Sequence, residues 1–223
     1  MILSGSDELF IIGDSLTAGF SGSVPVWQVY GPIVRALYGA VNVPSIAAPF
    51  LPPVKKPWPI IRAIDALAGR STGAIAPDAP TFAAFLAPYR KPTCAIVDLG
   101  INDADLIRQA LAPVPDVPTF TACATRILDG LNSIWGVPYS KILWIGPWGH
   151  DSGDDLVQIG LVEAALVALQ TTIGNGGLIR GFTLAKTSNT WNSVNTVGDG
   201  THPNQAGAVA RAVPVIAGLT YAT

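Results

Sequence analysis

The chain is poor in charge. Of its 223 residues, 13 are Lys or Arg and 15 are Asp or Glu, so that charged residues make up 13% of the sequence, about half the usual share. The longest basic run is the pair at 55 and 56, and the formal net charge is −2. Nucleic-acid binding needs a concentrated basic surface, so this class of partner is excluded. A surface with so little charge has to rely on Ser, Thr, Asn, Gly and Pro.

Cysteine and histidine are also scarce, with two of each. Cys94 lies in a strand-like run and Cys123 in a helix-like run, and this setting predicts buried free thiols rather than a disulfide. An acidic group at Asp151, Asp154 and Asp155 offers calcium ligands, but the start of a helix explains it better, because acids stabilise a helix N-terminus. The sequence therefore implies no metal and no cofactor.

Leader and membrane signals are missing as well. The first ten residues, MILSGSDELF, have neither a basic region nor a long apolar run, so no signal peptide is visible. The longest strongly apolar run, residues 159–174, contains Glu163 and is too short to span a bilayer. We expect a soluble protein without integral membrane contact. A secreted protein, or a part of a larger secreted or particle assembly, is favoured, while compartment and oligomeric state stay open.

What the chain has is apolar sequence arranged in alternating elements. Hydrophobic residues make up 49% of it, enough for a sizeable core. Near-continuous apolar runs predict strands covered on both faces, and helical stretches lie between them. The expected strands are 9–13, 40–47, 93–100, 141–147 and 179–185, and the expected helices are 25–39, 118–136, 154–174 and 203–219. This alternation predicts one α/β domain over residues 1–223, with a parallel sheet between helices.

One region breaks the rhythm. Residues 48–80 are long and rich in proline, with one short helix expected at about 59–68. Connections of this length inside a compact domain are often functional, as a lid or as a wall of a site. A peripheral loop packed by Pro57 and Trp58 fits the same statistic, so both interpretations stand.

Three segments carry side chains suited to acyl transfer. Ser15 follows the first expected strand in IIGDSLTA, Asn102 follows the third, and His202 lies near the C-terminus in GDGTHPN. A nucleophilic serine needs a general base, an acid that orients this base, and donors for the oxyanion. Asp199, three residues before His202, is placed to orient the imidazole from the same turn. In sheets of this kind ligands bind beyond the carboxyl ends of the strands, where these three segments converge.

Each segment has a plainer interpretation when it is taken alone. Asp199 and His202 together fit a hydrogen-bonded surface turn, and Asn102 fits the N-cap of a helix that starts near Asp103. We assign Asp14 and Asp103 to local structure, where they support their loops. The convergence of three separate segments favours the catalytic interpretation over these alternatives.

The segments GDSL at 13–16, GIND at 100–103 and DGTHPN at 199–204 resemble blocks I, III and V of the SGNH (GDSL-type) hydrolases, and their order covers nearly the whole chain. The resemblance implies a flavodoxin-like α/β/α sandwich with five parallel strands. It implies Ser15 as the nucleophile, His202 as the general base and then acid, and Asp199 as the residue that orients His202. An oxyanion hole formed by the Ser15 amide, a block II glycine amide and the Asn102 side chain is implied as well.

Block II is where the chain departs from this family. No glycine follows the second expected strand directly, and the best match is Gly73 in STG, 102 − 73 = 29 residues before Asn102. We therefore predict an insertion at about 48–70 and assign the block II role to Gly73, with Gly69 as the alternative.

The resemblance implies an ester hydrolase and leaves its substrate open. Trp58, Trp148, His150 and Trp191 are candidates for substrate contact, with His150 in the wall of the site rather than acting as a second base, while Trp135 and Trp144 are expected in the core. We favour a small ester or a carbohydrate O-acyl (acetyl) ester. A lipase, lysophospholipase or thioesterase acting on longer acyl chains is the close alternative. A glycan-binding module of an extracellular or viral assembly, with weakened catalysis, is the third.

Overall fold

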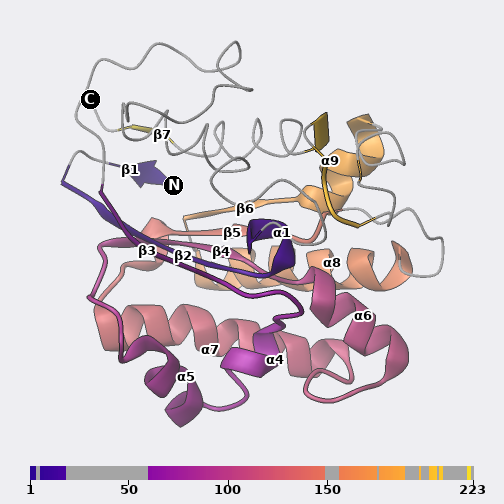
Figure 1. The fold of residues 1–223 in the computed structure, drawn as a ribbon, viewed down its shortest axis with the longest axis horizontal. Coiled ribbons are helices and arrows are strands. Elements are labelled where there is room, and N and C mark those ends of the chain that lie inside the picture. The colour runs from indigo at the N-terminus through magenta and orange to yellow at the C-terminus, as the bar shows by residue number, and fades with distance from the viewer. Residues whose placement is uncertain are drawn as a thin grey trace.

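The computed structural model describes residues 1–3, 6–18, 60–148, 156–174, 176–188, 196, 201–204, 206–207 and 220–221. Its centre is a parallel sheet of five strands in the order β3-β2-β4-β5-β6 (Figure 1). The strands of this sheet are β2 (Glu8–Gly13), β3 (Ile60–Ala66), β4 (Cys94–Asp98), β5 (Ile142–Ile145) and β6 (Gly177–Ile179). The predicted α/β fold with a five-stranded parallel sheet is confirmed.

Strands β2, β4 and β5 form where the sequence has its continuous apolar runs. Every residue of β4 and β5 is buried, as is every residue of β2 after Glu8. Such runs suit strands that are covered on both faces and hydrogen-bonded on both sides. In register, Gly13 at the end of β2 lies beside Ala66 of β3 and Asp98 of β4, so the segments that follow these three strands start from one edge of the sheet.

The helix expected at 59–68 is wrong, because these residues form β3, the edge strand beside β2. The apolar positions of Ile60, Ile64 and Leu67 also fit a helical spacing, and Asp65 interrupts the apolar run that would mark a strand. The described part of the expected insertion at 48–70 therefore includes a sheet strand. The strand expected at 40–47 lies outside the described residues.

Most helices lie below the sheet in Figure 1, where α6 and α7 contact α8, and α4 and α5 contact α7. Asp116 begins α7 by accepting a 2.8 Å hydrogen bond from the Thr119 amide, and Gly136 ends it with φ 75°. The helices are α1 (Ser15–Ala18), α4 (Thr72–Ile75), α5 (Ala79–Leu86), α6 (Ile101–Gln109), α7 (Val117–Trp135), α8 (Leu156–Ile173) and α9 (Gly181–Ser188), with a 3-10 turn at Tyr139–Lys141.

The helices expected at 118–136 and 154–174 correspond to α7 and α8. The strand expected at 179–185 is wrong beyond Ile179, because Gly181 begins α9. Buried Glu163 of α8 accepts hydrogen bonds from the Thr183 amide, at 3.2 Å, and from the Thr183 hydroxyl, which fixes α9 against α8. This tertiary contact explains why a short β-favouring stretch is helical here.

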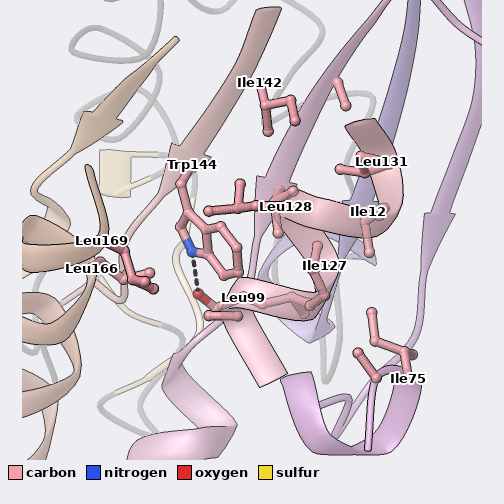
Figure 2. Packing of buried hydrophobic residues seen from close by; sticks show 14 of the residues in the cluster. Ile12, Ile75, Leu99, Ile127, Leu128, Leu131, Ile142, Trp144, Leu166 and Leu169 are labelled. Atoms are coloured by element: carbon pink, nitrogen blue, oxygen red, sulfur yellow. Dashed lines mark hydrogen bonds between the residues drawn. The ribbon is translucent and has the colours of Figure 1, made fainter. Parts of the chain in front are cut away.

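The core lies between the sheet and the helices α7 and α8 (Figure 2). Trp144 of β5 is 1% exposed and donates a 3.1 Å hydrogen bond from Nε1 to the Leu99 carbonyl, so that its polar atom is satisfied inside the core. Trp135 is buried as well, so both tryptophans are core residues as predicted. Cys94 and Cys123 are buried free thiols, also as predicted.

Two further features complete the fold. The short strands β1 (Ile2–Leu3) and β7 (Thr220–Tyr221) pair in parallel as a separate two-stranded sheet. Helix α8 is long and apolar enough to cross a membrane by length and composition, a test that core helices of soluble proteins pass as well. Here α8 packs on α6 and α7 and carries the buried Glu163.

Candidate active site

Ser15 lies at the first residue of α1, directly after the turn that ends β2. Asp14 shapes this turn: its Oδ1 accepts a 2.8 Å hydrogen bond from the Leu16 amide, and its carbonyl accepts one from the Thr17 amide at 3.2 Å. A Cβ on Gly13 would lie 2.2 Å from Thr17 Oγ1, so only glycine fits there. The turn therefore presents Ser15 at the carboxyl end of β2, and the predicted local role of Asp14 is confirmed.

A buried hydrogen bond ties this turn to the neighbouring strand. The Thr17 hydroxyl donates to Oδ2 of Asp98, the last residue of β4, and both side chains are at most 2% exposed. Because a hydrogen bond to a charged group is about twice as strong as a neutral one, it holds α1 at a fixed place over the sheet edge.

His202 reaches Ser15 from 187 residues away in the sequence. Its Nε2 lies 2.9 Å from Ser15 Oγ, within hydrogen-bonding distance. Pro203 pairs with Thr196 in an isolated bridge, and Asn204 donates from Nδ2 to the Thr196 carbonyl at 3.1 Å, which shapes the segment that carries the imidazole. This pair has the contact that a serine nucleophile needs with its general base. Asp199 lies outside the described residues.

Asn102 lies in the first turn of α6, just beyond β4. Its Nδ2 donates a 2.9 Å hydrogen bond to the Arg70 carbonyl. Gly100 is the N-cap of α6, with φ 135°, and Asn102 lies inside the helix, so the interpretation of Asn102 as a cap is wrong. The Asn102 amide has two donor hydrogens, and the contact with Arg70 uses one of them.

Asp103 holds the segment after β3 in place. Its carboxylate is fully buried and accepts hydrogen bonds from the Thr72 amide, at 2.9 and 3.1 Å, and from the Thr72 hydroxyl, at 2.6 Å. Burial raises the pKa of Asp103 to about 6, while hydrogen bonds from Thr72 and from the Gly73 backbone act in the opposite direction. Asp103 therefore has a structural role, as predicted, but the segment that it supports is the start of α4, 31 residues away, rather than only its own loop.

The two glycine candidates differ in their surroundings. Gly73 is buried in α4, its backbone bonds to Asp103, and a Cβ there would lie 2.6 Å from Val114 Cγ2. Gly69 has φ 75° and lies in the exposed turn after β3, where a Cβ would have no neighbour within 4 Å. The Leu67 amide at the start of this turn donates to the Gly13 carbonyl at 3.3 Å, which places the turn beside the strand end that leads to Ser15.

Arg70 connects the end of β2 with the end of β3. Its guanidinium is 8% exposed, pairs with Asp65 Oδ1 at 2.7 Å, and donates to the Gly13 carbonyl at 3.3 Å. The guanidinium lies 5.4 Å from the centre of the Phe85 ring, and the Tyr89 hydroxyl donates to the other oxygen of Asp65. This hydrogen bond raises the pKa of Tyr89. Together with a 2.8 Å hydrogen bond from Arg70 Nη1 to the Asp65 carbonyl, this ion pair ties the turn after β3 to the ends of β2 and β3.

A pocket of about 360 Å³ opens beside Asn102 and His202. Its size falls at the small end of the range for ligand sites. The sides are partly apolar and partly charged. Its lining residues are Ile101, Asn102, Ala104, Asp105, Arg108, Ile159, Thr201 and His202.

Of the predicted candidates for substrate contact, only Trp148 lies within the described residues. Trp148 is 1% exposed and packs at the start of α9, where a Cβ on Gly181 would lie 2.7 Å from its ring, so it is a core side chain rather than an open surface for substrate. Trp58, His150 and Trp191 lie outside the described residues.

Sequence reasoning missed the charged residues around the site. Asp65 and Arg70 fell within the expected insertion, and Asp105 and Arg108 were given no role. The low content of charged residues could have pointed to them. In a chain with so few charges, each acidic or basic residue is a candidate for a structural or binding role.

Comparison with known proteins gives structural relatives only. No protein-family model matches the chain, and no curated protein matches it. Among solved structures, acetylxylan esterase Axe2 from Geobacillus stearothermophilus has a TM-score of 0.68 at 14% identity, covering 98% of this chain and 96% of that one. The lipase/acylhydrolase from Enterococcus faecalis has 0.64 at 19% identity, covering 95% and 94%. A member of the lipolytic protein G-D-S-L family from Veillonella parvula has 0.61 at 19% identity, covering 94% and 96%.

These likenesses extend over nearly the whole of both chains in each pair. At identities of 14 to 19% they establish the fold and not the activity. The chain has the fold of the SGNH hydrolases, as the three sequence blocks predicted.

Proposed function

We propose that this protein is a serine ester hydrolase in which Ser15, His202 and Asp199 form the catalytic triad. The observation that carries the proposal is the 2.9 Å contact between His202 Nε2 and Ser15 Oγ at the carboxyl edge of the sheet. The SGNH fold supports it, since the similar structures named above include an esterase and an acylhydrolase.

The proposed reaction has two steps. Ser15 Oγ attacks the ester carbonyl carbon while His202 Nε2 takes its proton, and the carbonyl oxygen becomes an oxyanion. His202 then gives the proton to the departing alcohol, which leaves an acyl group on Ser15. A water molecule, deprotonated by His202, attacks the acyl carbon, and the acid and free Ser15 are released.

Three donors are proposed for the oxyanion. Two are the Ser15 amide and the Asn102 side chain, which retains a second N–H beside its contact with the Arg70 carbonyl. For the third we favour the Gly69 amide over the Gly73 amide, because the Gly73 backbone bonds to Asp103 and Gly69 lies in the turn beside the end of β2.

The pocket and the similar structures together support the proposed substrate class. A pocket of about 360 Å³ suits a short acyl ester or a carbohydrate O-acyl ester better than a long acyl chain. The likeness to an acetylxylan esterase supports this choice, and the likeness to a lipase/acylhydrolase keeps longer acyl esters as the second candidate.

Hydrolysis of p-nitrophenyl esters tests the proposal. The parent should release p-nitrophenol from the acetate ester, and Ser15→Ala and His202→Ala should each lose at least about 10⁴-fold in kcat/KM. Arg90→Leu, an exposed substitution next to the start of β4 and away from the site, should leave the rate unchanged. An inactive parent would favour the glycan-binding alternative. Preference for octanoate over acetate would favour the lipase alternative.

A further inference from the structure

Two residues of the proposed site, Asn102 and His202, line the pocket, and His202 contacts Ser15. A group attached to an ester whose carbonyl lies at Ser15 can therefore extend into this pocket. The composition of the pocket wall then selects among the esters that the enzyme accepts.

The wall of the pocket changes from apolar to charged along α6. Ile101, Ala104 and, from α8, Ile159 supply its apolar part. Asp105 and Arg108 follow Asn102 by three and six residues, which places them about 4.5 and 9 Å further along the helix axis at a rise of about 1.5 Å per residue. An extended alkyl chain that starts at the ester would soon reach both charged groups.

These charged groups are already paired. Arg108 Nη2 lies 2.7 Å from Asp105 Oδ1, and Gln109 donates to the other oxygen of Asp105 at 2.8 Å. The pair is about half exposed, with 40% of Arg108 and 52% of Asp105 accessible, and both residues line the pocket.

The chemistry of the pair favours one kind of occupant. Covering it with an alkyl chain would remove two charges from water without replacing their hydrogen bonds. An anionic ligand is repelled by Asp105, and a cationic ligand is repelled by Arg108. A ligand of either charge therefore has to disrupt the ion pair to bind here. A hydroxyl both donates and accepts, and can therefore bond to the carboxylate and to the guanidinium while the pair stays intact.

We infer that the pocket binds a neutral, hydroxyl-rich group such as a sugar ring, and that Asp105 and Arg108 are the residues that select it. The apolar wall formed by Ile101, Ala104 and Ile159 contacts the carbon skeleton of this group. The inference rests on the proposed ester hydrolysis and adds the substrate class and the residues that determine it.

The ion pair itself contributes little to stability, because exposed pairs three residues apart on a helix add only a few tenths of a kcal/mol. Loss of this pair should therefore leave the Asp105→Leu and Arg108→Leu variants folded. Circular dichroism and thermal unfolding check this. Arg90→Leu is the matched control, since it also replaces an exposed arginine by leucine but lies outside the pocket wall.

The experiment compares kcat and KM on three esters: p-nitrophenyl acetate, p-nitrophenyl octanoate and a monoacetylated methyl glycoside. Arg108→Leu and Asp105→Leu should each lower kcat/KM on the glycoside ester about ten- to a hundredfold, mainly through KM. The ratio of kcat/KM on the glycoside ester to kcat/KM on p-nitrophenyl acetate should therefore fall in both variants, and activity on the octanoate should improve. The double variant should lose less than the product of the two single losses, because the residues act as a pair.

Two results would overturn the inference. One is an unchanged ratio of glycoside to p-nitrophenyl acetate activity in both variants. The other is a parent that prefers the octanoate to the glycoside ester.

A parent that is inactive on all three esters contradicts the proposed function, and a binding measurement then tests the pocket by itself. Saturation-transfer NMR with the unacetylated methyl glycoside should give a signal with the parent that is lost in Arg108→Leu and kept in Arg90→Leu. Equal signals from the parent and Arg108→Leu would overturn the inference.

Discussion

Asn102 and Asp103 are consecutive in α6, and both bind the segment that follows β3. Asn102 donates to the Arg70 carbonyl, and Asp103 accepts from Thr72 two residues further on. The Asn102 amide thus has a structural contact in addition to its proposed place in the oxyanion hole. The contacts of the Asp103 carboxylate are structural. Substitution at each position should separate these roles.

Asn102→Ala should lower kcat by about 100- to 1000-fold with little change in KM, because an oxyanion donor acts mainly in the transition state. Steady-state kinetics on p-nitrophenyl acetate measures the effect. Asn132→Ala is a matched control, since Asn132 also donates to a backbone carbonyl, that of Val137 at 3.0 Å, but from the end of α7. If both variants lose only stability and keep kcat, Asn102 has no role in catalysis.

Asp103 should make folding stability depend on pH. The pKa of its carboxyl is raised to about 6 in the folded protein, above the ordinary value of 3.8, so its contribution to stability is complete below pH ~4 and is lost as the pH rises through ~6. Relative to Asp103→Asn, the parent should gain up to about 3 kcal/mol in free energy of unfolding between pH 7 and pH 4. Urea unfolding of both proteins at several pH values measures this difference, and parallel curves would contradict it.

At the scale of elements, helix packing is tighter between α5 and α7 than between α8 and α9 at Gly160. Helices α5 and α7 approach so closely at Gly130 that a Cβ there would lie 2.4 Å from Cδ1 of Phe82, whose ring is 1% exposed. On α8 the corresponding space is wider, since a Cβ on Gly160 would lie 3.3 Å from Phe182 Cε1.

Gly130→Ala should therefore destabilise the protein by about 1–3 kcal/mol, because the strain of overpacking exceeds the gain of up to about 1 kcal/mol from alanine in a helix. Gly160→Ala should change stability by less than about 1 kcal/mol in either direction. Chemical unfolding measures both variants. Equal effects at the two glycines would show that the α5–α7 contact does not have the close geometry described.

The elements that sequence predicted are those whose local signals agree with their tertiary surroundings. The runs that form β2, β4 and β5 are continuously apolar because both faces are buried, and Asp116 and Gly136 mark the ends of α7. Strand β3 was missed because it is an edge strand and contains Asp65, whose partner Arg70 comes from the turn beyond it. Helix α9 was missed because its contact with Glu163 is formed only in the folded protein.

The site was predictable where chemistry needs particular residue types at strand ends. Ser15, Asn102 and His202 were named from sequence, and the structure places the first and the last in contact. Sequence alone could not decide between Gly69 and Gly73, because the direction of an amide depends on the turn that carries it. The pocket pair of Asp105 and Arg108 was equally hidden, since helical spacing alone does not say which face meets the site.

At the scale of the whole molecule, several of the few charged residues are used to hold the site together. Charged residues make up only 13% of the chain, yet several of them are buried where the site is assembled. Asp98 fixes α1, Asp103 fixes the start of α4, and Arg70 joins the ends of β2 and β3. The five-stranded sheet brings these supports together, and Ser15 and His202 meet above them although they are distant in sequence.

Covalent labelling of Ser15 tests this account most directly. An alkyl fluorophosphonate forms a bond between its phosphorus and an activated serine oxygen, and fluoride leaves. Intact-mass spectrometry with peptide mapping should find one adduct per chain, on Ser15, absent in Ser15→Ala and formed at least about a hundredfold more slowly in His202→Ala. A parent that stays unlabelled, or an adduct that persists in Ser15→Ala, would contradict the account.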